Sequence, residues 1–256
     1  MPFRLPAYTP IPKPNKTTEL VKVSVAALRP TQWCIGLAEV WSREKDFATE
    51  TAQERLDYLR GKPVPLVRNA DGALWMVDRH HRLRGLLGID PHATAWGYLI
   101  ADQPTTNTND VLQFLQSHGW LYLYDGRGCG PMQAKDLPPT LLHLEDDPYR
   151  SLVWKLKQEG LIKPQPQIPY HEFRWGAWLR SRPLPPFSSR QLEPALAPAP
   201  ESAVRPRRSR FDAPLLSLAS PVPSSPFTWL RADSISAGNL DNSHVTSASE
   251  RLMGEE

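Results

Sequence analysis

The stretch Asp78-Arg79-His80-His81-Arg82-Leu83-Arg84 joins a short apolar run to a helical pattern and places five basic side chains within seven residues. The run before it, residues 73–77, follows the turn pair Asp71-Gly72, which predicts a buried strand after a hairpin turn. Beyond it, leucines recur at helical spacing, at positions 83, 86 and 87, and Gly88 ends the pattern. We therefore expect a strand followed by a short helix whose first turn holds the basic cluster.

A basic cluster at the start of a helix predicts an anion site. The first backbone N–H groups of a helix have no partner within it and attract negative charge, by about 0.3 to 1 kcal/mol when exposed. Arg and His donors make that attraction directional, and phosphate is the natural ligand. A purely structural interpretation stays open, in which Asp78 caps the helix and one of the two His has its nitrogens satisfied by the backbone. Cations at a helix start are opposed by the helix dipole, which favours a binding role.

The segments around this cluster form an ordered series: Val21-Lys22-Val23-Ser24-Val25, Leu28-Arg29-Pro30-Thr31-Gln32, Lys62-Pro63-Val64-Pro65-Leu66-Val67, the Asp-x-His-His-Arg stretch, Asp147-Pro148-Tyr149-Arg150-Ser151-Leu152 and Glu172-Phe173-Arg174-Trp175. The series resembles the ParB/sulfiredoxin superfamily, and in particular its branch of ParB-like nucleases, over roughly residues 20–181. The resemblance implies a small α/β (α+β) domain with a short mixed sheet flanked by helices. It also implies that the basic stretch binds phosphate.

The chemistry of this stretch differs among branches of the superfamily. Sulfiredoxins carry Gly-Cys-His-Arg, so His80 stands at their nucleophilic Cys and no sulfiredoxin activity is expected. Partition proteins carry Gly-Glu-Arg-Arg and use it with a nucleotide. Free-serine kinases carry Asp-Gly-His-Thr-Arg, with which Asp78, His80 and Arg82 align. Arg79 then replaces a Gly, which matters because Gly takes a positive φ freely and Arg does so only at a cost.

The second half predicts a strand over residues 92–101 and then an amphipathic helix over 111–116, capped by Asn109 or Asp110. The glycine-rich loop at 125–131 is interpreted as a turn. Residues 145–147 are acidic and precede a helix from Pro148 to about residue 160, for which Asp147 is a sufficient N-cap. Asp146 and Asp147 are also weak candidate ligands for Mg²⁺ or Mn²⁺, and the His171-Glu172 pair is similarly ambiguous. Arg150 is the residue of this helix that we expect to bind phosphate, because Arg presents paired donors.

Composition sets the expected organisation of the chain. It has 256 residues, 28 of them Pro and concentrated at both ends, which predicts a disordered arm at residues 1–18 and a disordered Pro/Ser/Arg-rich tail at 182–256. The superfamily-like domain is expected at 19–104 and a helical extension packed on it at 105–181. Two cysteines and the lack of a long apolar segment or secretory leader indicate a cytoplasmic protein without a membrane span. With a net charge of only +3, affinity for nucleic acid must come from local patches.

The leading hypothesis is a nuclease that acts on nucleic-acid phosphodiesters, as the resemblance implies. Asp78, His80 and His81 are then the catalytic candidates, with an imidazole pKa near 6.5 suited to proton transfer at neutral pH. The phosphate ligands are expected to be Arg79, Arg82, Arg84 and Arg150. The first alternative is a non-catalytic module that binds nucleotide or DNA, and a weaker one is a small-molecule kinase. The cofactor stays open between a divalent cation and a nucleoside triphosphate.

Overall fold

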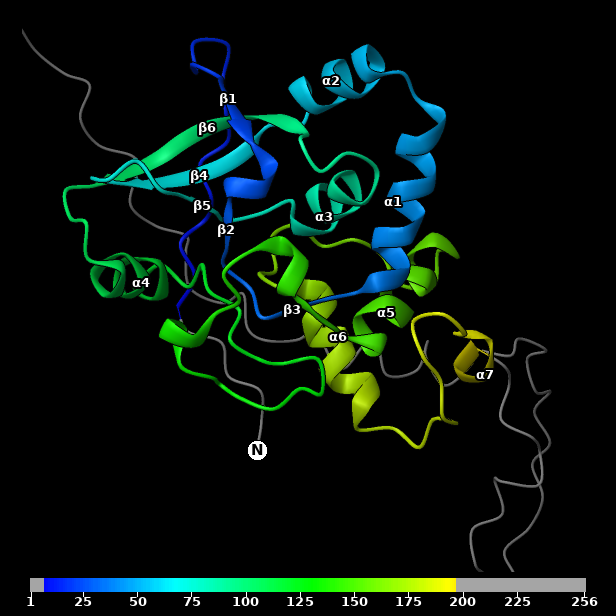
Figure 1. Cartoon of the computed structure of the whole chain (residues 1–256). Coiled ribbons are helices and arrows are strands. Elements are labelled where there is room, and N and C mark those ends of the chain that lie inside the picture. The colour runs from blue at the N-terminus through cyan, green and yellow to red at the C-terminus, as the bar shows by residue number, and fades with distance from the viewer. Residues whose placement is uncertain (1–6, 197–256) are drawn as a thin grey trace, which may run out of the picture. The chain divides into compact units, whose positions relative to one another are not determined.

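The structure of this chain is a computed structural model that describes residues 7–196, so residues 1–6 and 197–256 lie outside the description. A mixed five-stranded sheet is flanked by helices (Figure 1). This arrangement confirms the predicted α/β class with a small mixed sheet. Within the described range, no helix combines the length and the apolar character needed to cross a bilayer.

The sheet is built around two long central strands. Its spatial order is β1 (Val21–Ser24), β6 (Thr94–Gln103), β4 (Val64–Asn69), β5 (Leu74–Met76) and β2 (Arg29–Pro30). Strand β6 runs antiparallel to β1 and parallel to β4, while β5 runs antiparallel to β4 and parallel to β2. Val64, Leu66 and Val67 of β4 are all buried, because helices or loops cover both faces of this strand.

The hairpin between β4 and β5 delivers the chain to the basic cluster. Gly72 has a φ of 84°, and the Asp71 carboxylate accepts a hydrogen bond from the Ala73 N–H at 2.9 Å. A glycine with positive φ and an Asp side chain that accepts from the backbone two residues on are both typical of an Asp-Gly turn. The predicted hairpin and the strand after it are therefore confirmed, and helix α3 (His80–Ile89) follows within four residues of the strand's end.

Helix α3 packs between the sheet and helix α1 (Leu37–Thr49), and the two helices approach closely at Gly85. A Cβ at Gly85 would lie 2.8 Å from the Arg43 Cβ, so a glycine is needed for this spacing. Leu83, Leu86 and Leu87 are buried on the opposite side of α3, as their spacing predicts. Helix α2 (Ala52–Arg60) follows α1 and begins at a capping box formed by Thr51 and Glu54.

The remaining elements of residues 7–196 are four helices, a small parallel pair of strands and three short turns. The helices are α4 (Thr108–Ser117), α5 (Pro148–Gln158), α6 (His171–Arg180) and α7 (Glu193–Leu196), and the strands are β3 (Cys34–Ile35) and β7 (Glu145–Asp146); short 3-10 turns occupy Val25–Ala27, Ala134–Asp136 and Leu141–His143. Helix α5 starts at Pro148 as predicted. The cap of α4 is Asn107, whose side chain accepts from the Asn109 N–H, so the predicted cap at Asn109 or Asp110 lies two or three residues too late.

The predicted arm at residues 1–18 is wrong for residues 7–12. The Thr9 N–H donates to the His118 carbonyl at 2.9 Å, and the Thr9 carbonyl accepts from the Trp120 indole N–H at 2.7 Å. Tyr98 fixes the segment further along, because its hydroxyl donates to the Pro12 carbonyl at 2.8 Å. Residues 7–12 thus pack on the domain, although their proline content resembles that of a linker.

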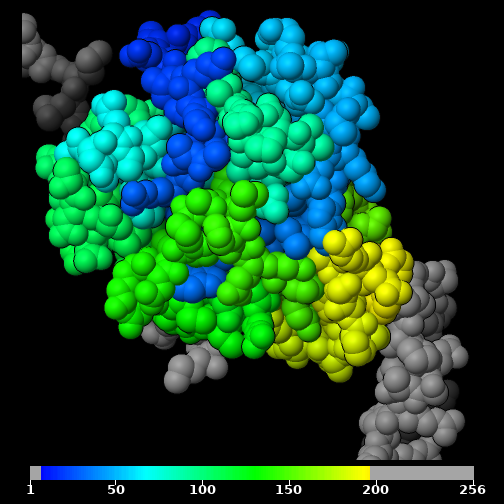
Figure 2. Space-filling model, in the orientation of Figure 1, coloured from blue at the N-terminus to red at the C-terminus, as the bar shows by residue number. Residues whose placement is uncertain are grey.

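The predicted tail at residues 182–256 also begins too early. Residues up to Leu196 pack on the body of the domain, where they appear in yellow in Figure 2. Ser189 is buried, and its hydroxyl lies 2.7 Å from both the Asp146 carboxylate and the Ser151 hydroxyl. These two hydrogen bonds hold residues 182–196 on the domain, although their sequence shows no periodic pattern of apolar residues. The rest of the predicted tail lies outside the described residues.

Candidate phosphate-binding site

The basic cluster opens onto a cavity of about 460 Å³. One wall is charged and comprises the starts of α3 and α6, Glu39 and Arg43 of α1, and Arg150 of α5. The rest of the lining is largely apolar and comes from Tyr8, Ile11 and the proline-rich segment 164–170. A volume of this size is typical of small-molecule sites, which span about 300–1,000 Å³.

Arg79 takes a left-handed backbone conformation at the start of α3, with a φ of 78°. Its N–H donates to the Asp78 carboxylate at 2.7 Å, and its guanidinium donates to the same carboxylate at 2.8 Å. The N-cap of α3 is therefore Arg79, and the interpretation of Asp78 as the cap was wrong. A non-glycine residue pays about 1 to 2 kcal/mol for this conformation. Tyr170, the N-cap of α6, has a φ of 51°, so both described non-glycine residues with positive φ line the cavity.

His80 is buried and satisfies a backbone group from the neighbouring loop. Its Nε2 accepts a hydrogen bond from the Thr31 N–H at 3.1 Å, and the Thr31 hydroxyl donates to the Met76 carbonyl at 2.8 Å. Burial, aided by the adjacent His81, lowers the pKa of His80 to about 3. The expected pKa near 6.5 is therefore wrong for this residue, because the protein interior disfavours the imidazolium.

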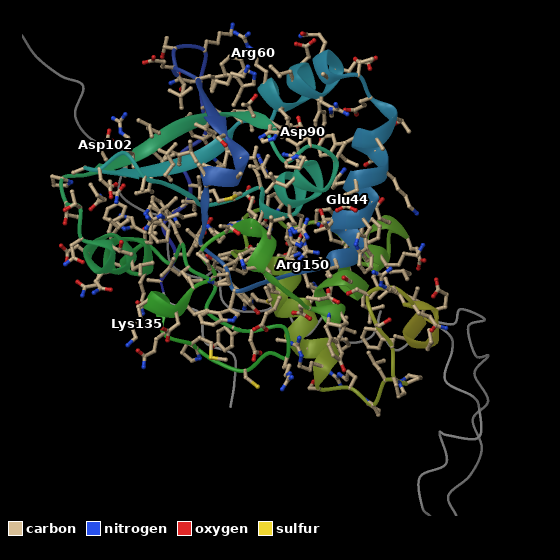
Figure 3. All side chains as sticks on the ribbon, in the orientation of Figure 1. Glu44, Arg60, Asp90, Asp102, Lys135 and Arg150 are labelled. Carbon is tan, nitrogen blue, oxygen red and sulfur yellow. The ribbon has the colours of Figure 1, made fainter. Side chains whose placement is uncertain are left out.

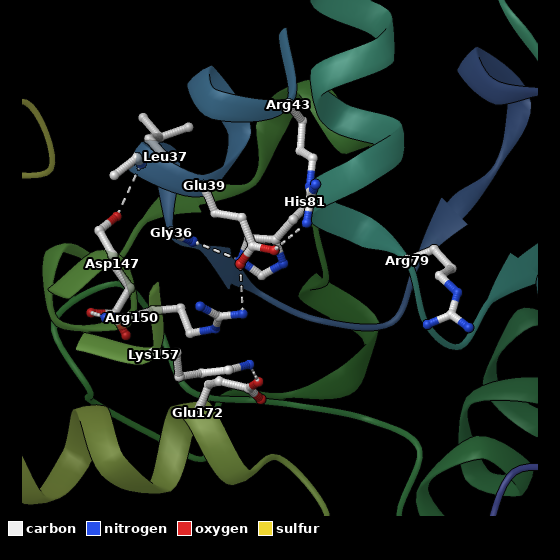
Figure 4. A network of polar contacts seen from close by, with 12 residues as sticks. Gly36, Leu37, Glu39, Arg43, Arg79, His81, Asp147, Arg150, Lys157 and Glu172 are labelled. Atoms are coloured by element: carbon white, nitrogen blue, oxygen red, sulfur yellow. Dashed lines mark hydrogen bonds and ion pairs between the residues drawn. The ribbon is translucent and has the colours of Figure 1, made fainter. Parts of the chain in front are cut away.

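His81 has a similar role on the α1 side. Its Nε2 accepts from the Gly36 N–H at 3.1 Å, at the start of α1, and lies 3.9 Å from the Glu39 carboxylate (Figure 4). Burial and then the positive charge of Arg150 lower the pKa of His81 to about 3, despite the nearby Glu39. Both histidines of the cluster are thus neutral at physiological pH, and each holds a backbone N–H through Nε2.

Arg150 is the best-placed cation in the cavity. Its Nη2 donates to Glu39 Oε2 at 2.9 Å, and its side chain is only 7% exposed (Figure 4). Figure 3 places Arg150 in the interior of the domain, whereas Lys135 and Asp102 lie at its periphery. Its Nε and Nη1 are buried and have no hydrogen-bond partner among residues 7–196. Unpaired buried donors are costly, so this guanidinium calls for an acceptor in the cavity.

Carboxylates also border the cavity, but cations exceed them. Arg43, Arg79, Arg82 and Arg150 line it together with Asp78, Glu39 and Glu172. Burial alone would raise the pKa of Glu172, but Arg150 and Lys157 hold it at about 2. Burial likewise opposes the ionisation of Glu39, yet neighbouring positive charge lowers its pKa. With both histidines neutral, the wall keeps an excess of positive charge, which suits an anion.

The other predicted phosphate ligands, Arg79, Arg82 and Arg84, do not all lie in the cavity. The Arg82 guanidinium lines the cavity and lies 5.3 Å from the centre of the Tyr58 ring. Arg79 points away from the network of His81, Glu39 and Arg150 in Figure 4. Arg84 does not line the cavity and instead lies 3.9 Å from the Glu44 carboxylate. The structure therefore brings Arg150 and the start of α3 to one cavity and leaves Arg84 outside it.

The two candidate metal ligands have structural roles. Asp147 accepts hydrogen bonds from the Tyr149 and Arg150 N–H groups and forms an ion pair with Arg180, which confirms its prediction as the N-cap. Asp146 accepts from the Leu37 N–H at 3.1 Å and from Ser189. Over residues 7–196, no three His, Cys, Asp or Glu side chains form a group that could hold a metal ion.

Sequence reasoning did not identify Glu39, the partner of Arg150, or Tyr8, which reaches the cavity from the N-terminal segment. Glu39 lies in the first turn of α1, a helix that the sequence reading did not propose. The available signal was the apolar spacing of Val40 and Phe47, both buried. Nothing in the sequence around Tyr8 marks it, because only the folded chain brings residues 7–12 to the cavity.

Fold and site together define a class: an α/β domain in which the start of a helix after a hairpin strand carries a candidate anion site. Comparison with known proteins makes this specific. A family model described as "Putative ParB-like nuclease" matches residues 21–181, and the chain belongs to this family. Among solved structures, protein Atu1540 from Agrobacterium tumefaciens is similar, with 26% identity and a TM-score of 0.58 over 66% of this chain and 82% of that one. No curated protein matches.

Proposed function

We propose that the chain binds a phosphate group of nucleic acid in this cavity and hydrolyses nucleic-acid phosphodiesters. The observation that carries the proposal is Arg150, a buried guanidinium with two N–H donors that have no partner among the described residues. An Arg fork matches two oxygens of a phosphate, and the start of α3 adds backbone donors. Membership of the ParB-like nuclease family supports a phosphodiester as the group bound.

We also propose new roles for several residues of the cavity. His80 and His81 are neutral and use Nε2 to hold backbone N–H groups, so we propose that they position the loops before α1 and α3. Hydrolysis requires water to attack phosphorus, the P–O bond to the leaving oxygen to break, and a proton to reach that oxygen. Asp78, Glu39 and Glu172 are the carboxylates that border the cavity. Asp78, with a side chain 50% exposed, is the most accessible of them to act on water or to contact a divalent cation.

The test is cleavage of end-labelled single-stranded and duplex DNA by the full chain with Mg²⁺ or Mn²⁺. Arg150→Lys keeps a positive charge beside Glu39 but lacks the guanidinium fork, so we expect at least a tenfold loss of cleavage. Arg84→Lys is the matched control, because Arg84 lies outside the cavity, and it should cleave as the wild type does. Equal cleavage by wild type and Arg150→Lys would refute the assignment of Arg150.

The non-catalytic alternative predicts binding without turnover. Calorimetry would then detect DNA or a nucleoside triphosphate, the signal would weaken in Arg150→Lys, and no cut ends or released phosphate would form over hours. Product formation that depends on Arg150 would exclude this alternative.

One observation favours a nucleotide as the ligand of that alternative. Arg79 adopts the positive φ that a Gly would supply in the Asp-Gly-His-Thr-Arg pattern, so the backbone geometry of that pattern is available here despite the substitution. The kinase alternative shares this feature, and it predicts that ADP forms only when a hydroxyl compound is added. A screen of such compounds without ADP formation would remove it.

A further inference from the structure

We infer that Tyr8 and Tyr170 bind the base of a single unpaired nucleotide whose phosphate lies on Arg150. The inference rests on the proposed phosphate binding and names the ligand class of the same cavity. It starts from the lining of the cavity, which has a charged part and an apolar part. The charged part of the lining carries four arginines, whereas its apolar part carries Tyr8, Ile11, Ile168 and Tyr170. A ligand that fills both has an anionic end and a flat apolar end.

The two tyrosines form an aromatic corner. Their ring centres are 6.2 Å apart and their planes meet at 76°, so the two rings face different directions and are not stacked on each other. Tyr170 is held in place because its hydroxyl donates to the Gly119 carbonyl at 3.0 Å. Both side chains are only partly buried, although they lie in the cavity wall. In this inference the base contacts the exposed part of these rings, the interaction that sequence-tolerant nucleic-acid sites use.

The segment that carries Tyr8 is fastened to the domain at two neighbouring points. The hydrogen bonds of Thr9 to His118 and Trp120 fix one of them. Gly119 provides the other, since a Cβ on it would lie 2.3 Å from the Ala7 carbonyl oxygen. Tyr8 and Ile11 precede the family-matched residues 21–181, whereas Ile168 and Tyr170 lie within them, so the apolar lining combines the N-terminal segment with the family domain.

The size of the cavity limits the ligand to one nucleotide unit. A cavity of about 460 Å³ has room for a base, a sugar and a phosphate, and we infer that it takes one nucleotide and not a base pair within a duplex. A base must leave the stack to enter such a site, which single-stranded ends and free nucleotides allow without unpairing. The ligand is therefore a nucleoside monophosphate unit, either free or part of a single strand.

The experiment compares three probes on the full chain by calorimetry: inorganic phosphate, thymidine 5′-monophosphate and a 5′-phosphorylated oligothymidylate. We expect the monophosphate to bind more tightly than inorganic phosphate. Tyr8→Ala should reduce this preference by about fivefold to a hundredfold, the range that the loss of one base–aromatic stack produces. Tyr8→Phe should keep the preference. Tyr8→Leu, which preserves an apolar wall without a π-face, should lower it. Thr9→Ala is the control in the same segment.

The outcomes separate the two proposals. If Arg150→Lys weakens all three probes while Tyr8→Ala and Tyr8→Leu keep the wild-type preference, the aromatic wall is refuted and the phosphate site stands. If Arg150→Lys binds every probe as the wild type does, the phosphate site fails and this inference fails with it. A duplex that competes as well as the oligothymidylate would also overturn the inference. Tighter binding of the oligothymidylate than of the monophosphate identifies a strand as the source of the nucleotide, whereas equal binding identifies the free nucleotide.

Discussion

Replacing Arg150 with Met tests how the buried charges of the cavity support one another. Arg150 and Glu39 are 2.9 Å apart, with side chains 7% and 15% exposed. Met keeps much of the side-chain volume but leaves the Glu39 carboxylate buried without its closest cation. Breaking one side of a buried ion pair costs about 3 to 5 kcal/mol. We therefore expect Arg150→Met to lower the free energy of unfolding by about 3 kcal/mol at pH 7, a large share of the roughly 5 to 15 kcal/mol typical of a domain.

The assay is urea unfolding followed by tryptophan fluorescence for wild type, Arg150→Met, Glu39→Gln and the double variant. Glu39→Gln removes the stranded charge, so the double variant should recover at least about 2 kcal/mol relative to Arg150→Met. In Arg150→Met the pKa of Glu39 rises above its unfolded value, so the deficit relative to wild type is present at high pH and shrinks as the pH falls through that raised pKa. A loss below about 1 kcal/mol, or a double variant no more stable than Arg150→Met, would refute the reasoning.

Three further predictions concern the surroundings of the cavity. Arg79→Gly should be about 1 kcal/mol more stable than Arg79→Ala in urea unfolding, because both variants lose the side chain and only Gly relieves the positive φ; equal stability would contradict the strain. His80 and His81 have pKa values of about 3 in the folded chain and near 6.5 unfolded, so the unfolded chain binds more protons between these values. Stability should therefore be fully present above about pH 6.5 and fall by about 1.4 kcal/mol per pH unit for each histidine below it, and the slope should be halved in His80→Asn. Gly119→Ala, with its φ of 69° and the Ala7 carbonyl 2.3 Å from the new Cβ, should expose residues 7–12 to limited proteolysis that wild type resists.

The local elements could be predicted because their signals are local. The Asp71-Gly72 turn, the leucine spacing of α3 and the Asp147-Pro148 start of α5 each specify a backbone conformation from a few adjacent residues. Arg150 was also predicted, since its segment resembles the family. Where each of these elements lies in the fold depends on contacts between residues that are far apart in the sequence. A pattern of neighbouring residues cannot predict such contacts.

The errors have a common physical origin. Residues 7–12 and 182–196 lack apolar periodicity and resemble linkers, yet tertiary contacts hold them, such as the hydrogen bond of Ser189 to Asp146 and the burial of Leu192. The roles of the histidines were misjudged for a related reason. A His in a basic cluster is expected to titrate near neutral pH, and only the packing of α3 against α1 and the loop at Thr31 reveals that both rings are buried.

The cavity is better described as a meeting of helix starts than as one basic cluster. Helices α3 and α6 begin in its wall, and Arg150 comes from the first turn of α5. Helix starts carry partial positive charge, and here that charge adds to the arginines. Arg79 and Tyr170 both adopt left-handed conformations as the N-caps of α3 and α6, each at a cost of about 1 to 3 kcal/mol, and such residues persist only where the surrounding structure determines them. An anion in the cavity would lie near the starts of α3 and α6 and the Arg150 side chain of α5, so its binding would stabilise the arrangement in which these strained caps are held.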